Sequence, residues 1–178
     1  MIIHHKRILP SAGFTLVEII MVLAIVAIVA AVAAPNMSSM IDSARYKANL
    51  GQLVRDLNLA RSEAVKRGEW VVVSTTSGSW SGGWRIFQDD NNDELYDEEE
   101  TEIQVRDEVS GVSIASVDGF TSYIRYNPTG TSHTTGSFMV TSNSSDDSDV
   151  LCIGSTGQLK FSRCPAEADP CETSLACP

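Results

Sequence analysis

A single carboxylate, that of Glu18, lies near the start of a long apolar segment of this 178-residue chain. Between residues 14 and 34 only Thr15 and Glu18 interrupt the hydrophobic side chains. As a helix this segment is about 30 Å long, which matches the hydrocarbon core of a bilayer. An unpaired carboxylate in that position costs about 2.5–3.5 kcal/mol. The pattern therefore predicts a membrane helix in which Glu18 needs a positively charged partner.

The acidic segment 89–100 is a candidate metal site, because it has the spacing of a calcium-binding loop. Oxygen-bearing side chains occupy the first, third, fifth, ninth and twelfth positions of the EF-hand pattern: Asp89, Asn91, Asp93, Asp97 and Glu100. However, Glu94 replaces the glycine that makes the sharp turn in such loops, and strands rather than helices are expected to flank this one. We therefore interpret the segment as a solvated acidic loop and predict no metal or other cofactor.

The four cysteines, at positions 152, 164, 171 and 177, all lie near the carboxyl end of the chain. Clustered cysteines in an exported segment favour disulfides over redox catalysis. Because Cys152 and Cys164 flank the expected turn at Ser155–Gly157, we predict the pairs Cys152–Cys164 and Cys171–Cys177. Four cysteines allow three connectivities, so the other two stay open.

Neither catalysis nor nucleic-acid binding is favoured by the remaining polar residues. The three histidines are scattered at positions 4, 5 and 133, and no nucleophile lies at a suitable spacing from a base. The net charge of −10 repels phosphate, and the final expected hairpin offers only the cations Lys160 and Arg163. We predict a protein that is not an enzyme and has no useful affinity for DNA.

A long helix is expected to carry the apolar segment and to continue beyond it. Pro35 removes one backbone donor and predicts a kink. From 35 to 67 the periodicity predicts an amphipathic helix that Gly68 ends, with charged residues such as Asp56 in the intervening positions. Its apolar residues recur at a spacing of three to four: Met37, Met40, Ile41, Ala44, Ala48, Leu53, Val54, Leu57, Ala60, Ala64 and Val65.

After Gly68 the period changes to two, which predicts strands. The expected strands are 70–76, 84–88, 102–106, 112–117, 122–126, 137–142, 150–153 and 159–162. Because one long helix precedes a run of strands, we expect an α+β fold in which antiparallel sheets bury one face on the second half of the helix. The aromatic residues of these strands are expected in the core: Trp70, Trp80, Trp84, Phe87, Tyr123 and Tyr126.

The hexapeptide Gly13-Phe14-Thr15-Leu16-Val17-Glu18 and the apolar run after it resemble the processing site of type IV prepilins and type II secretion pseudopilins. The resemblance implies that a prepilin peptidase cuts between Gly13 and Phe14 and that Phe14 becomes N-methylated. It also implies that Glu18 pairs with the terminal amine of a neighbouring subunit in a filament. An ordinary signal peptide would be cut after Ala31-Val32-Ala33, but its apolar region is shorter, at about 7–15 residues.

Motifs in the second half of the chain resemble the pseudopilin H/FimT/FimU group. They are Arg61-Ser62-Glu63-Ala64, the segment 83–89, the acidic loop and the final glycine-containing hairpin. The resemblance implies a β-sandwich packed on the helix and a structural function. It also implies four regions: a leader at 1–13, a transmembrane or filament-core helix at 14–34, an amphipathic helix at 35–67 and a periplasmic domain at 68–178.

The expected function is that of a minor pilin, which primes or tips a type IV filament in the manner of FimU. The alternatives are the tip pseudopilin H of a type II secretion system and a DNA-binding competence pilin of the FimT type. The partners implied are other pilins or pseudopilins, the prepilin peptidase and the inner-membrane assembly platform. The leader contains Lys6 and Arg7, so we expect a cytoplasmic amino terminus and a periplasmic domain.

Overall fold

The computed structural model describes residues 13–118, 120, 122–144 and 147–163. The chain divides into two compact units, Met1–Ser38 and Ser39–Pro178. The predicted long helix is present as α1, Leu16–Arg67, and it continues through Pro35 rather than ending there. The kink at Pro35 stays a prediction. Within the described residues, no helix has a stretch both long and apolar enough to cross a membrane.

The helix ends where the sequence predicts, at Gly68. This glycine has a φ of +72°, in the left-handed region that other residues rarely adopt, and its N–H donates to the carbonyl of Ala64 at 3.0 Å. Lys66 and Arg67 lie in the last turn and both contact Glu63, at 3.1 and 2.7 Å. The hydrogen bonds from Arg67 and Lys66 lower the pKa of Glu63.

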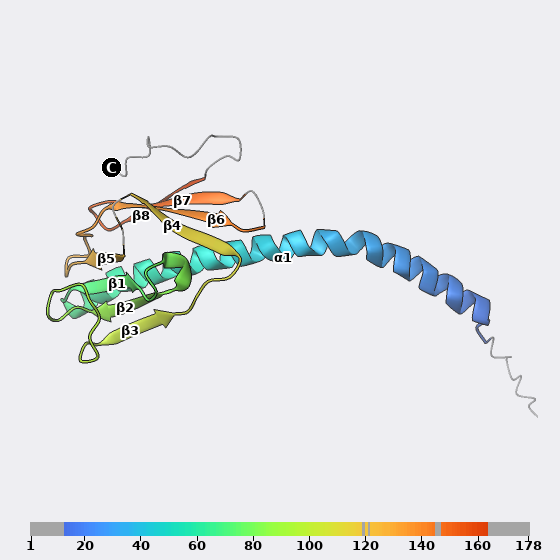
Figure 1. Ribbon diagram of the computed structural model, residues 1–178, viewed down its shortest axis with the longest axis horizontal. Helices are drawn as coiled ribbons and strands as arrows, with labels where there is room; N and C mark the ends of the chain where they lie inside the picture. The colour runs from blue at the N-terminus through green and yellow to red at the C-terminus, as the bar shows by residue number, and fades with distance from the viewer. Residues whose placement is uncertain (1–12, 119, 121, 145–146, 164–178) are drawn as a thin grey trace, which may run out of the picture. The chain divides into compact units, whose positions relative to one another are not determined.

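The strands form two antiparallel four-stranded sheets (Figure 1). The first has the order β3-β2-β1-β5, with bounds Glu102–Arg106, Trp84–Gln88, Val71–Thr75 and Tyr123–Tyr126. The second has the order β4-β6-β7-β8, with bounds Val112–Asp118, Gly136–Ser142, Ser148–Ile153 and Leu159–Arg163. All eight predicted strands and the α+β fold class are confirmed. The 3-10 helix η1, Trp80–Gly82, was not predicted.

The core of the second unit lies between the second half of α1 and both sheets. Leu53, Leu57, Ala60 and Ala64 are fully buried and repeat at helical spacing on one side of α1. Alternate strand residues such as Val71 and Val73, Ile124 and Tyr126, and Phe138 and Val140 meet them. Most of the predicted core aromatics are buried, but Trp70 and Tyr123 are only half-buried.

Asp56 is buried, which corrects the prediction that it lies on the polar face of the helix. The residue is 2% exposed, and both its oxygens accept hydrogen bonds from the Arg106 guanidinium, at 2.8 and 3.2 Å. Trp84 Nε1 and Gln52 Nε2 complete its shell at 3.0 and 2.9 Å. The hydrogen bonds to Asp56 raise the pKa of Arg106. This cluster fixes α1 to β2 and β3.

Two further polar side chains fix α1 to the second sheet and to the turns beside it. The Tyr46 hydroxyl contacts the carbonyl of Val140 at 3.0 Å and the Asp149 carboxylate at 2.9 Å. Arg61 donates to the carbonyls of Gly130 at 2.7 Å and Thr156 at 3.3 Å. Arg61, part of the motif that resembles the pseudopilin group, therefore has a structural role: it holds two glycine-containing turns against the helix.

Candidate functional site

The amino-terminal residues form a helix cap around Glu18. Its Oε2 accepts hydrogen bonds from the backbone N–H and the hydroxyl of Thr15, both at 2.9 Å. In return, the Glu18 N–H donates to the Thr15 hydroxyl at 3.3 Å. Such a reciprocal pair is a capping box, in which a serine or threonine precedes a glutamate by three residues. The spacing of Thr15 and Glu18 is a signal that the sequence analysis missed.

The rest of this amino-terminal segment presents apolar side chains to its surroundings. From Phe14 to Val29 every large hydrophobic side chain is between 49% and 82% exposed. A soluble monomer rarely leaves a continuous apolar surface of this kind uncovered. The segment is therefore built to contact something other than its own chain.

Arg125 organises the acidic loop, although its place between the buried Ile124 and Tyr126 in β5 predicts an exposed side chain. This side chain is 8% exposed and makes ion pairs with Asp89 at 3.1 Å and with Glu94 at 3.2 Å. It also donates to the Asn92 side chain, and its guanidinium lies 4.0 Å from the centre of the Trp70 ring. A cation between carboxylates and an aromatic face is well compensated for its burial.

The loop is not solvated along its whole length as predicted, because Asp89 and Glu100 at its two ends are buried. Asp89 faces Arg125, and the two Glu100 oxygens accept the backbone N–H groups of Asp90 and Asp97, both at 3.1 Å. Inside the loop, Asn91 and Asp93 accept backbone N–H groups two residues ahead. These contacts close the loop on itself.

The calcium-spaced residues are not arranged as a metal site. Asp89 and Glu100 are engaged at the base of the loop, whereas Asn91, Asp93 and Asp97 are exposed. In the part of the chain that the structure describes, no three or more His, Cys, Asp and Glu side chains are placed to hold a metal ion. The residues with EF-hand spacing instead close the loop, through an ion pair at Asp89 and hydrogen bonds at the other four positions.

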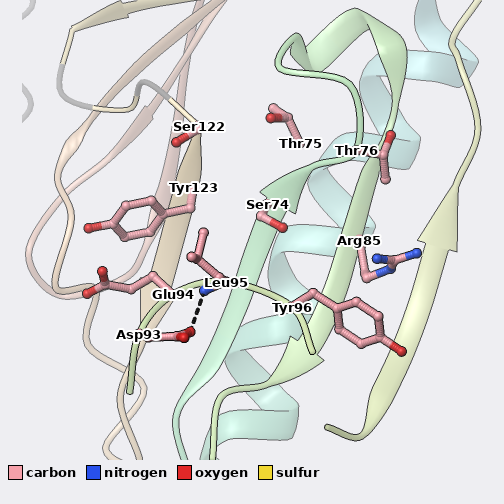
Figure 2. Close-up of a pocket in the computed structure, with 10 residues that line it drawn as sticks. All are labelled: Ser74, Thr75, Thr76, Arg85, Asp93, Glu94, Leu95, Tyr96, Ser122 and Tyr123. Carbon is pink, nitrogen blue, oxygen red and sulfur yellow. Dashed lines mark hydrogen bonds between the residues drawn. The ribbon is translucent and has the colours of Figure 1, made fainter. Parts of the chain in front are cut away.

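A cleft of about 360 Å³ lies beside the tip of this loop. Figure 2 shows its walls: Leu95 of the loop lies between the rings of Tyr123 and Tyr96, and hydroxyl side chains extend from Ser74 beside Leu95 to Thr75, Thr76 and Ser122 above it. The Arg85 guanidinium stacks on Tyr96 at 4.0 Å and pairs with Glu102 at 2.8 Å.

Comparison with protein families identifies the family of this chain. A sequence model described as type II transport protein GspH matches residues 49–157, which include the last part of α1 and the strands from β1 to β7. The chain belongs to the GspH family. A second model, the prokaryotic N-terminal methylation motif, matches residues 10–34 of this GspH-family chain. The recognition of a type IV pilin-like protein is therefore confirmed.

Solved structures share the fold of this GspH-family chain. The type IV minor pilin FimU of Pseudomonas aeruginosa is 18% identical, with a TM-score of 0.56, over 70% of this chain and 91% of FimU. The minor pseudopilin EpsH of the Vibrio cholerae type 2 secretion system is 13% identical, with a TM-score of 0.51, over 67% of this chain and 97% of EpsH. No curated protein sequence matches the chain significantly. At these identities the structural likeness shows the fold alone.

The GspH-family domain places Cys152 in β7, where it is buried opposite Lys160 of β8. Each strand residue advances about 3.4 Å, and a disulfide needs Cα atoms about 4.4–6.8 Å apart. A bond from Cys152 to Cys164 therefore requires the chain to turn back after Arg163. Cys164, Cys171 and Cys177 lie outside the described residues, so both predicted pairings stay predictions.

Proposed function

We propose that this chain is a structural, non-catalytic minor subunit that primes or tips a type IV filament, in the manner of FimU. The observation that carries the proposal is the amino-terminal segment, an exposed apolar surface that contains one carboxylate, Glu18. The membership of the GspH family and the methylation motif support it. The chain would act by assembling with other pilins or pseudopilins through this segment.

Processing between Gly13 and Phe14 creates the positive partner that Glu18 needs. A Cβ atom added at Gly13 meets nothing within 4 Å, so the folded chain itself does not require glycine there. A glycine at position 13 instead fits recognition by a separate molecule, the prepilin peptidase. In the filament, the new Phe14 amine of one subunit then lies close to Glu18 of its neighbour. The Oε1 atom of Glu18 is available for this contact, since it accepts no hydrogen bond within the described residues.

Before assembly, we propose, residues 14–34 anchor the chain in the inner membrane with the amino terminus in the cytoplasm and the domain in the periplasm. The assembly platform extracts the subunit, and the apolar surface is buried again against neighbouring helices. An ion pair in such surroundings compensates two buried charges, whereas Glu18 alone would keep its desolvation cost.

The first test is the variant Glu18→Ala in cells that assemble the filament. We expect the variant chain to accumulate normally but to be lost from sheared filaments by at least about tenfold, because an unpaired amine then remains buried. Glu108→Ala, which removes an exposed carboxylate from the domain, is the matched control and should leave recovery unchanged. Normal recovery of the Glu18 variant would contradict the proposal.

The second test is the mature amino terminus. The intact mass of the membrane-extracted chain should correspond to a methylated Phe14 start, and Gly13→Val should retain the leader. A mass that corresponds to a start at Ala34 would establish an ordinary signal peptide instead.

The second candidate is the tip pseudopilin H of a type II secretion system, because the matching family is described as a type II transport protein. Deletion of the gene separates the two roles. Loss of surface pili with normal protein secretion supports the pilus, and loss of secretion with normal pili supports the secretion system.

A further inference from the structure

The cleft at the tip of the acidic loop lies on the face of the first sheet that points away from the helix. Val71 and Val73 of β1 belong to the core beneath α1, so the alternating residues Val72 and Ser74 face the other side. On this outer face the acidic loop covers part of the sheet, and Tyr96 packs edge-on against Phe87.

The tip of the loop presents a large apolar side chain at the cleft. Leu95 is 67% exposed, although its backbone is fixed by a hydrogen bond of 2.8 Å to Asp93. The preceding residue, Glu94, is tied to the buried Arg125. Figure 2 shows Leu95 at the cleft between Tyr123 and Ser74. The position of Leu95 is therefore set in advance, which favours binding because little freedom is left to lose.

The charges of the acidic loop beside the cleft select the chemistry of an occupant. The nearby cations are already compensated, since Arg85 pairs with Glu102 and Arg125 pairs with Asp89 and Glu94. Five exposed carboxylates of the same loop pair with no cation among the described residues. Asp93 lines the cleft, whereas a separate hollow on the loop is lined by the other four: Asp90, Asp97, Glu98 and Glu99. A basic segment is attracted to such a surface, and a cation can also stack on a tyrosine ring.

We propose that this cleft docks a lysine- or arginine-bearing segment of a neighbouring filament subunit, with an apolar side chain of that segment packed on Leu95. The inference rests on the proposed filament role, and it adds a side-by-side contact between domains to the contact between helices. The apolar contact supplies the centre of the interface, and the carboxylates form its charged rim.

The test places a photoreactive phenylalanine analogue at Leu95 of the full-length chain in cells that assemble the filament. The control places the same analogue at Val117, an exposed apolar residue of β4 in the other sheet. We expect an adduct with another filament subunit from position 95 only, and its cross-linked peptide should contain lysine or arginine. Glu98→Lys with Glu99→Lys should lower the adduct at least about tenfold, while Asp107→Lys with Glu108→Lys should not.

Each outcome separates this inference from the proposed function, because sheared filaments are collected from the same cells. A chain that is recovered in filaments but gives no adduct at position 95 overturns the docking site alone. An adduct that survives the Glu98 and Glu99 reversal, or that forms equally at position 117, also overturns it. Absence of the chain from filaments overturns the proposed function and the docking site with it.

Discussion

Asp56 shows how much one buried carboxylate contributes to joining the helix to its sheet. Its partners come from β2, from the end of β3 and from the helix itself, so three elements converge on two oxygen atoms. Substitution would leave the buried Trp84 N–H without an acceptor and the partly exposed Arg106 charge without its partner. The cost of such a loss exceeds the net benefit of the pair.

We therefore expect Asp56→Ala to lower the free energy of unfolding by about 2 kcal/mol, mainly through the unsatisfied Trp84 N–H. Asp42→Ala is the matched control on the same helix, because Asp42 only approaches Arg45 at 3.9 Å near the surface. The control should change stability by less than about 0.5 kcal/mol. Denaturant unfolding of the detergent-solubilised chain measures both, and equal losses would contradict the assignment.

Several single residues could not be predicted from the sequence, for a physical reason. Asp56 and Tyr46 occupy positions that a helical pattern assigns by the polarity of the side chain, and their partners are distant in the chain. Arg125 alternates regularly with the buried Ile124 and Tyr126, so it reads as an exposed strand residue. Only the covering acidic loop buries it, and strand periodicity contains no information about that loop.

At the scale of elements, the acidic loop and its arginine form one folded part. Arg125→Met keeps an apolar stem against Trp70 but leaves the buried Asp89 without its cation. We expect a loss of about 3–5 kcal/mol and faster cleavage of the chain at Glu98 and Glu99 by a glutamate-specific protease. Arg85→Met, which breaks a partly exposed pair with Glu102, should cost less than about 1 kcal/mol.

The double variant Asp89→Leu with Arg125→Met distinguishes pairing from packing. Removing both charges avoids an uncompensated buried carboxylate, so the double variant should regain part of the stability that Arg125→Met loses. If the stability lost in the double variant equals the sum of the losses of Asp89→Leu and Arg125→Met measured singly, the ion pair does not hold the loop.

The positions of the elements were largely predictable, and their order in space was not. Alternating residues identified every strand to within about two residues, and Gly68 identified the helix end. The chain nevertheless leaves the first sheet for β4, returns to it for β5 and leaves again for β6. Periodicity reports which face of a strand is buried, but it does not report which neighbour the strand pairs with.

At the scale of the whole molecule, two tyrosines make stability depend on alkaline pH. Burial, then the hydrogen bond to Asp149, raises the pKa of Tyr46, and burial raises the pKa of Tyr126. Because the pKa is raised in the folded state, the contribution of each tyrosine to stability is fully present below about pH 10, the pKa of tyrosine in the unfolded chain. This contribution is lost as the pH rises above that value.

We expect the free energy of unfolding to fall above about pH 10 by up to about 1.4 kcal/mol per pH unit for each of these tyrosines. Unfolding curves between pH 8 and about 11 measure the slope. Tyr46→Phe should be less stable at neutral pH but should show a shallower decline. An unchanged slope in this variant would assign the alkaline sensitivity to other groups.

The contacts between α1 and the second sheet also have a consequence in time. The hydrogen-bond acceptors of Tyr46 are synthesised 94 and 103 residues after it, and the carbonyls that Arg61 contacts are synthesised 69 and 95 residues after it. At a synthesis rate of about 5–20 residues per second, the delay for Tyr46 is about 5–20 s. During that interval Leu53 and Leu57 have left the ribosome without the strands that cover them. A chaperone that shields apolar helices therefore has a defined period in which to act on this segment, before its own sheets are made.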